Sequence, residues 1–114
     1  MANKTYCLAL DLVNDVKLIA EYKAYHRQVW PEIIASIKDS GIRRLDIYCT
    51  GNRLFMIIEA EENFSFERKK VMDELNPKVQ EWETLMWKYQ QAVPWAAKGE
   101  KWILMDKIFE LPQA

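Results

Sequence analysis

The chain has 114 residues, of which 16 are basic and 17 acidic, so its formal net charge is −1. This near-neutral balance gives no electrostatic footprint for nucleic acid or an anionic membrane, and neither is expected as a partner. No apolar run approaches the ~20 residues of a membrane-spanning helix. The length predicts one domain, residues 1–114, with its own hydrophobic core.

The start of the chain and its cysteines indicate a compartment and exclude some kinds of site. The N-terminal residues lead into a strand-like segment without the apolar core of a signal peptide, which favours the cytoplasm. Cys7 and Cys49, with a single histidine in the chain, are too few for the usual zinc sites. The three glycines stand apart, so they form no phosphate-binding loop. We expect neither a metal nor a cofactor.

The first third of the chain predicts a strand followed by a long helix. Residues 5–13 (TYCLALDLV) are rich in apolar and β-branched side chains, as strands are. A helix is expected from about residue 16 to residue 39, capped at its start by Asn14 or Asp15. Pro31 lies inside it, removes one backbone hydrogen bond and disfavours the helical conformation in the residue before it. We expect the helix to kink or restart there.

The remainder predicts a hairpin, a broken helical region and a last strand, at residues 43–49, 54–60, 64–75, 77–91 and 102–109. Gly51 and Asn52 form the hairpin turn, and Asn76-Pro77 is typical of the start of a helix. The order is β-α-β-β-α-β, an α+β, ferredoxin-like arrangement with helices on one face of an antiparallel sheet. The uncovered face retains apolar side chains, so we expect a second copy to cover it in a two-fold homodimer.

The motif Tyr22-x3-His26-x3-Trp30-Pro31-Glu32 contains the only histidine. On a helix, this spacing places Tyr22, His26 and Trp30 on one side, each step advancing ~40°. The rest of that side is apolar, so the imidazole points inward between a phenol and an indole. A small polar ligand with a stackable face needs such groups. The alternative is a core histidine whose polar atoms are satisfied inside the protein.

The second helical region carries an apolar stripe typical of a core: Val79, Trp82, Met86, Tyr89 and Val93. Trp87 lies ~100° around the helix from Met86, at the flank of the stripe. A tryptophan in that position covers either the edge of a pocket or part of the core or a subunit contact.

With these segments in place, the chain resembles the L-rhamnose mutarotase family and its L-fucose-acting relatives over residues 5–111. Five stretches carry the resemblance: Glu21-Tyr22-x3-His26-x3-Trp30-Pro31-Glu32, Ile47-Tyr48, Leu54-Phe55-Met56 leading to Glu59, Trp87-Lys88-Tyr89 and Phe109-Glu110-Leu111-Pro112. The resemblance implies a homodimeric α+β barrel that interconverts the α and β pyranose anomers of a 6-deoxyhexose without a cofactor.

The resemblance also implies roles for individual residues. His26 stands at the position of the proton donor, and Tyr22 at that of a sugar-contacting tyrosine. The partner of His26 in proton transfer stays open: Tyr22 could relay or orient, and Glu32 or Glu59 could serve as base if buried. The family's tandem tryptophan pair reads Met86-Trp87 here, and a sugar-contacting tyrosine of the second strand aligns with Leu45. These two departures indicate a reshaped pocket, which leaves L-fucose as credible a substrate as L-rhamnose. Trp30 and Trp87 are expected to stack on the apolar face of the sugar.

Two other functions remain open for the same architecture. One is a non-catalytic module that binds a small ligand. The other is a small monooxygenase acting on an aromatic substrate or haem, which a single histidine and several tryptophans would also suit. Accelerated anomer exchange with L-fucose or L-rhamnose separates the mutarotase from both.

Overall fold

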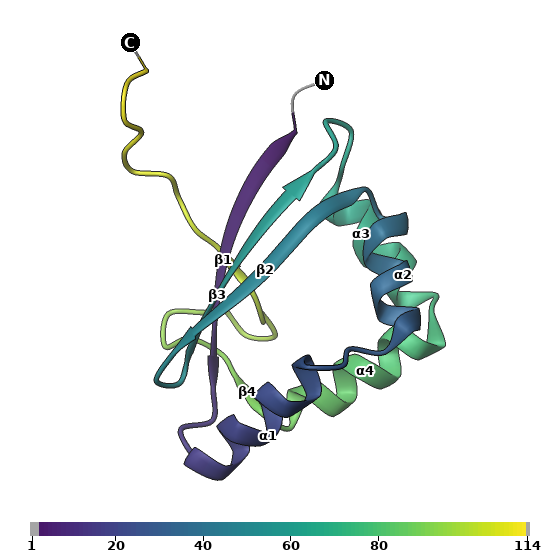
Figure 1. Ribbon diagram of the computed structural model, residues 1–114, viewed down its shortest axis with the longest axis vertical. Coiled ribbons are helices and arrows are strands. Elements are labelled where there is room, and N and C mark those ends of the chain that lie inside the picture. The colour runs from purple at the N-terminus through teal and green to yellow at the C-terminus, as the bar shows by residue number, and fades with distance from the viewer. Residues whose placement is uncertain (1–2, 114) are drawn as a thin grey trace.

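The computed structural model describes residues 3–113 (Figure 1). In chain order its elements are β1 (Lys4–Leu12), α1 (Val16–His26), α2 (Pro31–Asp39), β2 (Ile42–Thr50), β3 (Arg53–Ala60), α3 (Phe66–Glu74), α4 (Pro77–Trp87), β4 (Gln90–Gln91) and β5 (Ile103–Leu104). Within the described part of the chain, no helix is long and apolar enough to cross a membrane. The expected α+β, ferredoxin-like order of elements is confirmed in outline.

The sheet is antiparallel, with strand order β2-β3-β1-β4, and β5 pairs separately with β1. The β2–β3 hairpin closes as expected on Gly51 and Asn52, with Thr50 paired to Arg53. Gly51 has φ +55°, which glycine adopts without the steric cost that a side chain brings. β1 therefore lies in the middle of the sheet, where its leucines are buried.

The four helices lie on one side of the curved sheet (Figure 1). The helical region after β1 restarts rather than bends, because Trp30 has φ −56° and ψ 136° and Pro31 opens α2. Asp15, not Asn14, caps α1 by accepting a hydrogen bond from the Leu18 N–H at 3.0 Å. These features confirm the break predicted at Pro31.

Three expected boundaries were wrong. The last strand, expected over residues 102–109, is a strand only at Ile103–Leu104, because only there does it pair with β1. The helix expected to continue to residue 91 ends at Trp87, and Gln90–Gln91 pair with β1 instead. The helix expected from residue 64 begins at Phe66, since Ser65 caps it.

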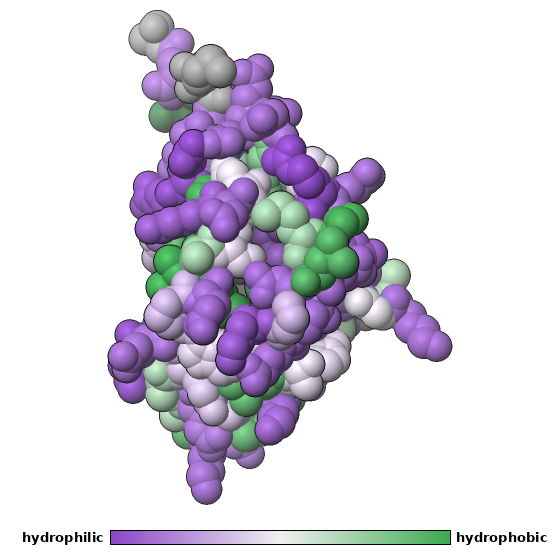
Figure 2. Space-filling view, turned by 90° about the vertical axis from the view of Figure 1, so that its right-hand side faces the viewer, coloured by the Kyte–Doolittle hydropathy of each residue, from purple (hydrophilic) through white to green (hydrophobic). Residues whose placement is uncertain are grey.

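Two buried clusters fill the space between the sheet and the helices. One joins α1, α2 and α4 to β1 and β3, and includes Tyr22, Trp82 and Met86. The other lies toward α3 and includes Leu8 and Phe64. Seen from the helix side, the surface is mostly hydrophilic, with separate hydrophobic groups (Figure 2).

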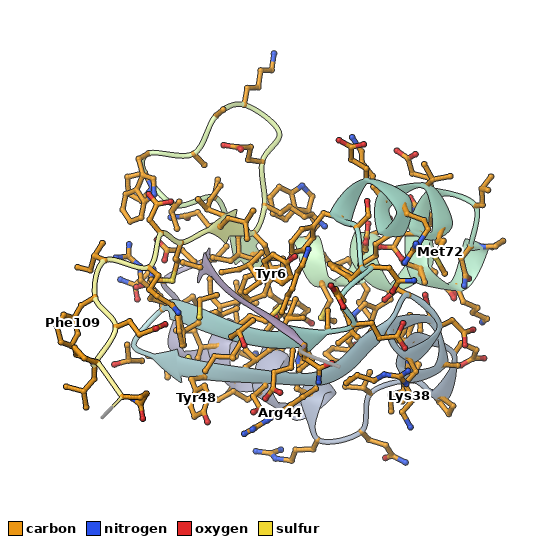
Figure 3. All side chains as sticks on the ribbon, turned by 90° about the horizontal axis from the view of Figure 1, so that it is seen from above. Tyr6, Lys38, Arg44, Tyr48, Met72 and Phe109 are labelled. Carbon is orange, nitrogen blue, oxygen red and sulfur yellow. The ribbon has the colours of Figure 1, made fainter. Side chains whose placement is uncertain are left out.

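The two faces of the sheet differ in what covers them. Tyr6 points to one side of the sheet, where its ring packs on Phe64 and Phe66. Arg44 and Tyr48 point to the other side (Figure 3). No helix covers that outer face within residues 3–113, and Tyr48 is 56% exposed there.

Candidate active site

A cavity of about 600 Å³ lies between the inner face of the sheet and helices α2, α3 and α4. Its walls are largely apolar, with Leu8, Leu45 and Met56 from the sheet and Trp82 and Met86 from α4. Trp102, next to β5, adds a second indole to the wall. The space is large enough for a monosaccharide, and apolar walls with a few polar groups are typical of small-molecule sites.

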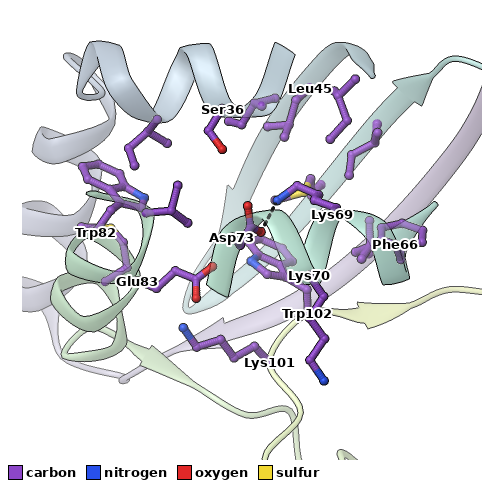
Figure 4. A pocket seen from close by; sticks show the side chains of 18 of the residues that line it. Ser36, Leu45, Phe66, Lys69, Lys70, Asp73, Trp82, Glu83, Lys101 and Trp102 are labelled. Atoms are coloured by element: carbon purple, nitrogen blue, oxygen red, sulfur yellow. Dashed lines mark hydrogen bonds and ion pairs between the residues drawn. The ribbon is translucent and has the colours of Figure 1, made fainter. Parts of the chain in front are cut away.

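Charged side chains gather at the α3 end and mouth of this cavity (Figure 4). Lys69 and Asp73 form an ion pair at 2.7 Å on α3. Glu83 of α4 and Lys101 face each other from two walls (Figure 4). Burial lowers the pKa of Lys101 despite the neighbouring Glu83 carboxylate. The rim is therefore rich in both signs of charge.

Tyr22 and His26 lie one turn apart on α1, and their rings are in contact, with centroids 4.3 Å apart. Tyr22 is buried, whereas His26 is partly buried at the last residue of the helix. The His26 Nδ1 atom lies 2.8 Å from the Tyr22 carbonyl oxygen. Because a carbonyl only accepts, Nδ1 carries a proton, and in the neutral ring Nε2 keeps a free lone pair.

Burial moves the pKa values of these two side chains in opposite directions. It lowers the pKa of His26 below 6.5, and the hydrogen bond to the Tyr22 carbonyl offsets this only in part. It raises the pKa of Tyr22, against a smaller opposite effect of its hydrogen bond with Gln90. At neutral pH the pair is therefore an uncharged imidazole beside an uncharged phenol.

Neither His26 nor Tyr22 is itself among the described residues that line the cavity, but each contacts one that is. The His26 ring packs edge-on against Trp82, with centroids 5.6 Å apart. The Tyr22 hydroxyl accepts a hydrogen bond from Gln90 Nε2 at 3.4 Å. Trp82 and Gln90 both line the cavity, so the pair is one side chain removed from it.

The other residues singled out in the sequence divide between the cavity and its surroundings. Leu45 and Met86 line it. Trp30 packs on Trp82, with ring centroids 5.0 Å apart. It lines a separate, more open hollow together with residues of α1. Trp87 is 43% exposed, and the Lys101 ammonium lies 4.7 Å from its ring centroid. Trp87 is not among the lining residues, but Lys101, which packs on it, is.

The sequence gives no site role to Trp82, Gln90, Lys101 and Trp102, which the structure places at the cavity. The core stripe predicts Trp82 as a buried residue, which is correct, but Trp82 also forms part of the cavity wall. Gln90 has no local signal, because β4 is defined only by its pairing with β1. No group of three or more potential metal ligands occurs among residues 3–113.

An antiparallel sheet with helices on one face and a cavity between the layers defines a small α+β-barrel protein. Two solved structures share this fold. The L-rhamnose mutarotase of Formosa agariphila has a TM-score of 0.69 and 21% identity, with 96% of this chain and 99% of that chain covered. The tetracenomycin F2 cyclase of Streptomyces glaucescens has a TM-score of 0.58 and 17% identity, with 97% and 98% covered.

Sequence comparison gives the particular family. The profile of L-rhamnose mutarotase matches residues 5–111. The L-fucose mutarotase of Xanthomonas campestris pv. campestris is 41% identical over 116 aligned positions, which cover all of this chain and 93% of that protein. This chain belongs to the L-rhamnose mutarotase family, whose members are isomerases acting on carbohydrates.

Proposed function

We propose that this protein interconverts the α and β pyranose anomers of a 6-deoxyhexose, L-fucose or L-rhamnose. Family membership supports the reaction class, and the whole-length similarity to an L-fucose mutarotase supports including L-fucose. The observation that carries the proton chemistry is the His26 contact, in which Nδ1 is held by the Tyr22 carbonyl at 2.8 Å. That contact fixes the ring and leaves the Nε2 lone pair unused by the protein. For Nε2 to act on the sugar, the ligand or the Trp82 side chain must move, because Trp82 lies between His26 and the cavity.

Mutarotation removes a proton from the anomeric hydroxyl and delivers one to the ring oxygen. The C1–O5 bond breaks to give the aldehyde, the C1–C2 bond rotates, and reclosure returns both protons to give the other anomer. In our proposal, Nε2 of neutral His26 takes the proton of the anomeric hydroxyl and delivers it to the ring oxygen as the C1–O5 bond breaks. On closure Nε2 takes that proton from the O5 hydroxyl and returns it to the aldehyde oxygen, so the imidazole acts as base and then as the expected proton donor in each half of the reaction.

Tyr22 is the proposed partner of His26. Its raised pKa keeps the phenol protonated, so its hydroxyl can donate a hydrogen bond to the sugar. Leu45 and Met86 are proposed to contact the sugar from the cavity wall. Direct stacking by Trp30 and Trp87 stays a prediction, which requires the ligand or Lys101 to move beyond the arrangement seen here.

We also propose a cytoplasmic homodimer. Cys7 and Cys49 are both free thiols, which suits a reducing compartment. Apolar groups on the outer face of the sheet and in the C-terminal segment support association with a second copy, since Tyr48, Phe109 and Leu111 are 56%, 72% and 67% exposed.

Saturation-transfer NMR on L-fucose and on L-rhamnose tests the proposal. We expect the protein to accelerate exchange between the anomer signals of at least one sugar. His26→Gln should return exchange to the unaided rate, a loss of ~10²–10⁴-fold typical of acid–base catalysis. Lys23→Gln, an exposed change on the same helix, is the matched control and should keep full activity.

Each other outcome has a defined meaning. Full activity in His26→Gln would refute the proton role of this residue. Sugar binding without accelerated exchange would refute the enzyme and leave the ligand-binding module. Neither binding nor exchange with either sugar would refute the 6-deoxyhexose proposal altogether.

A further inference from the structure

Gln90 has an unusual environment for a cavity residue. It sits in β4, opposite Leu12 of β1, and its side chain lines the cavity. Its Nε2 donates to the Tyr22 hydroxyl at 3.4 Å. Its Oε1 is the one buried side-chain nitrogen or oxygen without a hydrogen-bond partner among the described residues.

An unpartnered buried carbonyl is costly, because folding removes it from water without replacing the hydrogen bond. Native proteins satisfy the great majority of such groups, so each exception calls for a reason. Gln90 is one of the residues that line the cavity, although Oε1 itself lies within the wall with almost no accessible surface. A small turn of the side chain would bring Oε1 to a ligand in the cavity, which would supply the missing donor, and the free oxygen then serves binding instead of stability.

The Tyr22 and Gln90 side chains complement each other. Tyr22 uses its oxygen to accept from Gln90, so its own O–H is left to donate. Gln90 uses one amide end for Tyr22, so its other end is left to accept. A sugar hydroxyl both donates and accepts, and one donor beside one acceptor matches it.

We propose that Gln90 is a specificity-determining residue of the sugar site, which orients Tyr22 through Nε2 and accepts a hydrogen bond from one substrate hydroxyl through Oε1. The inference rests on the proposed mutarotase function and deepens it. Beside Gln90, the Trp82 and Met86 side chains of α4 offer no strong acceptor. The carboxylates of the wall lie elsewhere, since Asp73 is paired with Lys69 and Glu83 faces Lys101. A substrate hydroxyl that faces Gln90 would therefore be recognised by this amide.

The test couples a protein change to a ligand change. Anomer exchange and sugar binding are measured by NMR for the wild type, Gln90→Met and Gln90→Glu, with L-fucose, L-rhamnose and their single-deoxy analogues. Gln90→Met keeps the side-chain length and removes both polar ends. Gln91→Met is the matched control, because Gln91 is exposed and neighbours Gln90 on the same strand.

We expect Gln90→Met to raise KM or Kd by about tenfold, the value of a hydrogen bond of ordinary strength. We also expect one deoxy analogue to bind the wild type about tenfold more weakly than its parent sugar, and to bind Gln90→Met as the parent does. Gln90→Glu keeps an acceptor and should retain part of the discrimination. Gln91→Met should behave as the wild type.

The proposal would be overturned if, for every deoxy analogue, the ratio of its Kd to that of the parent sugar is the same in the wild type and in a folded Gln90→Met. Oε1 would then bond to water only. If both variants fail to fold, the wild type alone decides: the proposal is overturned when it binds every deoxy analogue as tightly as the parent sugar. An effect of the deoxy change on Kd that depends on Gln90, without accelerated anomer exchange, would retain the Gln90 proposal and refute the mutarotase. Accelerated exchange without that dependence would retain the mutarotase and refute the Gln90 proposal. Absence of any sugar binding would overturn both.

Discussion

Three neighbouring side chains share one pattern, in which one polar atom is held and another is free. His26 holds Nδ1 on a backbone carbonyl, which leaves Nε2. Tyr22 accepts from Gln90, which leaves its own O–H and the Gln90 Oε1. The atoms already hydrogen-bonded fix the orientation of each side chain. Of the free groups, His26 Nε2 and Gln90 Oε1 are acceptors, and the Tyr22 O–H is a donor. Such prior orientation lowers the cost of arranging groups around a reacting ligand.

The lowered pKa of His26 makes stability and activity pH-dependent. The unfolded chain has the ordinary histidine pKa of about 6.5, so below that pH it binds protons more strongly than the folded state. The free energy of unfolding should fall as pH drops from about 6.5 toward the folded pKa, and be fully restored above 6.5. Urea denaturation gives the free energy of unfolding at several pH values for the wild type and for His26→Gln. The difference between the two isolates this contribution, because the chain has one histidine.

Exchange activity should fall at lower pH, as the pH drops through the lowered pKa of His26 in the folded protein, since protonation then fills the Nε2 lone pair. The pH profile of kcat/KM for L-fucose checks this expectation. A rate that instead rises as the pH falls would show that the imidazolium is the starting form, and would contradict the neutral base proposed for ring opening.

Trp87 permits a prediction about binding. Its indole is 43% exposed and partly covered by the Lys101 ammonium, 4.7 Å from the ring centroid. Trp87→Ala should raise KM several-fold and change kcat little, because stacking contributes to binding rather than to proton transfer. Steady-state exchange kinetics measure both values. Unchanged KM would remove Trp87 from the sugar site; Trp95→Ala, at another exposed tryptophan, is the control.

Local spacing predicted the Tyr22–His26 pair, because both lie on one helix and no distant contact is needed to bring them together. It could not predict Gln90, whose role depends on pairing with Leu12, far away in the sequence. It also placed Trp30 and Trp87 nearer the site than the structure does. The helical spacing that put Trp30 on one side with Tyr22 and His26 does not apply, because α1 ends at His26 and Trp30 has a non-helical backbone. For Trp87, helical spacing gives a side but not the neighbour across it.

At the scale of elements, predictions held where the signal was local. The Gly51-Asn52 turn and the restart at Pro31 follow from backbone chemistry within a few residues. The last strand, expected over 102–109, failed because a strand needs a partner, and β1 offers one only to Ile103–Leu104. Beyond Leu104, one more backbone hydrogen bond joins the segment to β1, in which the Met105 N–H donates to the Cys7 carbonyl oxygen at 2.8 Å.

Helix α1 carries both His26 and Tyr22, so its N-terminal cap supports the site. Asp15 accepts from the Leu18 N–H at 3.0 Å, and Asp15→Ala should lower the free energy of unfolding by about 1 kcal/mol. Thermal or urea unfolding measures the loss. Asn14→Ala is the matched control, because Asn14 makes no cap bond among the described residues. An equal loss in both variants would contradict the cap.

At the scale of the whole molecule, apolar surface is distributed unevenly. The helix side is mostly hydrophilic (Figure 2). The C-terminal segment leads away from the helices (Figure 1), and its Ile108 is 95% exposed. On the outer face of the sheet, Phe55 and Ile57 alternate with the inward Leu54, Met56 and Ile58. A stable monomer rarely leaves such groups to water, so an interface is expected there.

A charge on that outer face should therefore separate two copies of the chain. We expect the wild type to sediment as a dimer, and Ile57→Lys, in the central strand β3, to sediment as a monomer because a lysine would be buried without a partner. Val71→Lys, at a 54% exposed position on α3, adds the same charge on the helix side and should remain dimeric. Circular dichroism separates dissociation from unfolding. A folded Ile57→Lys dimer would place the interface elsewhere, and a monomeric wild type at micromolar concentration would contradict the homodimer itself.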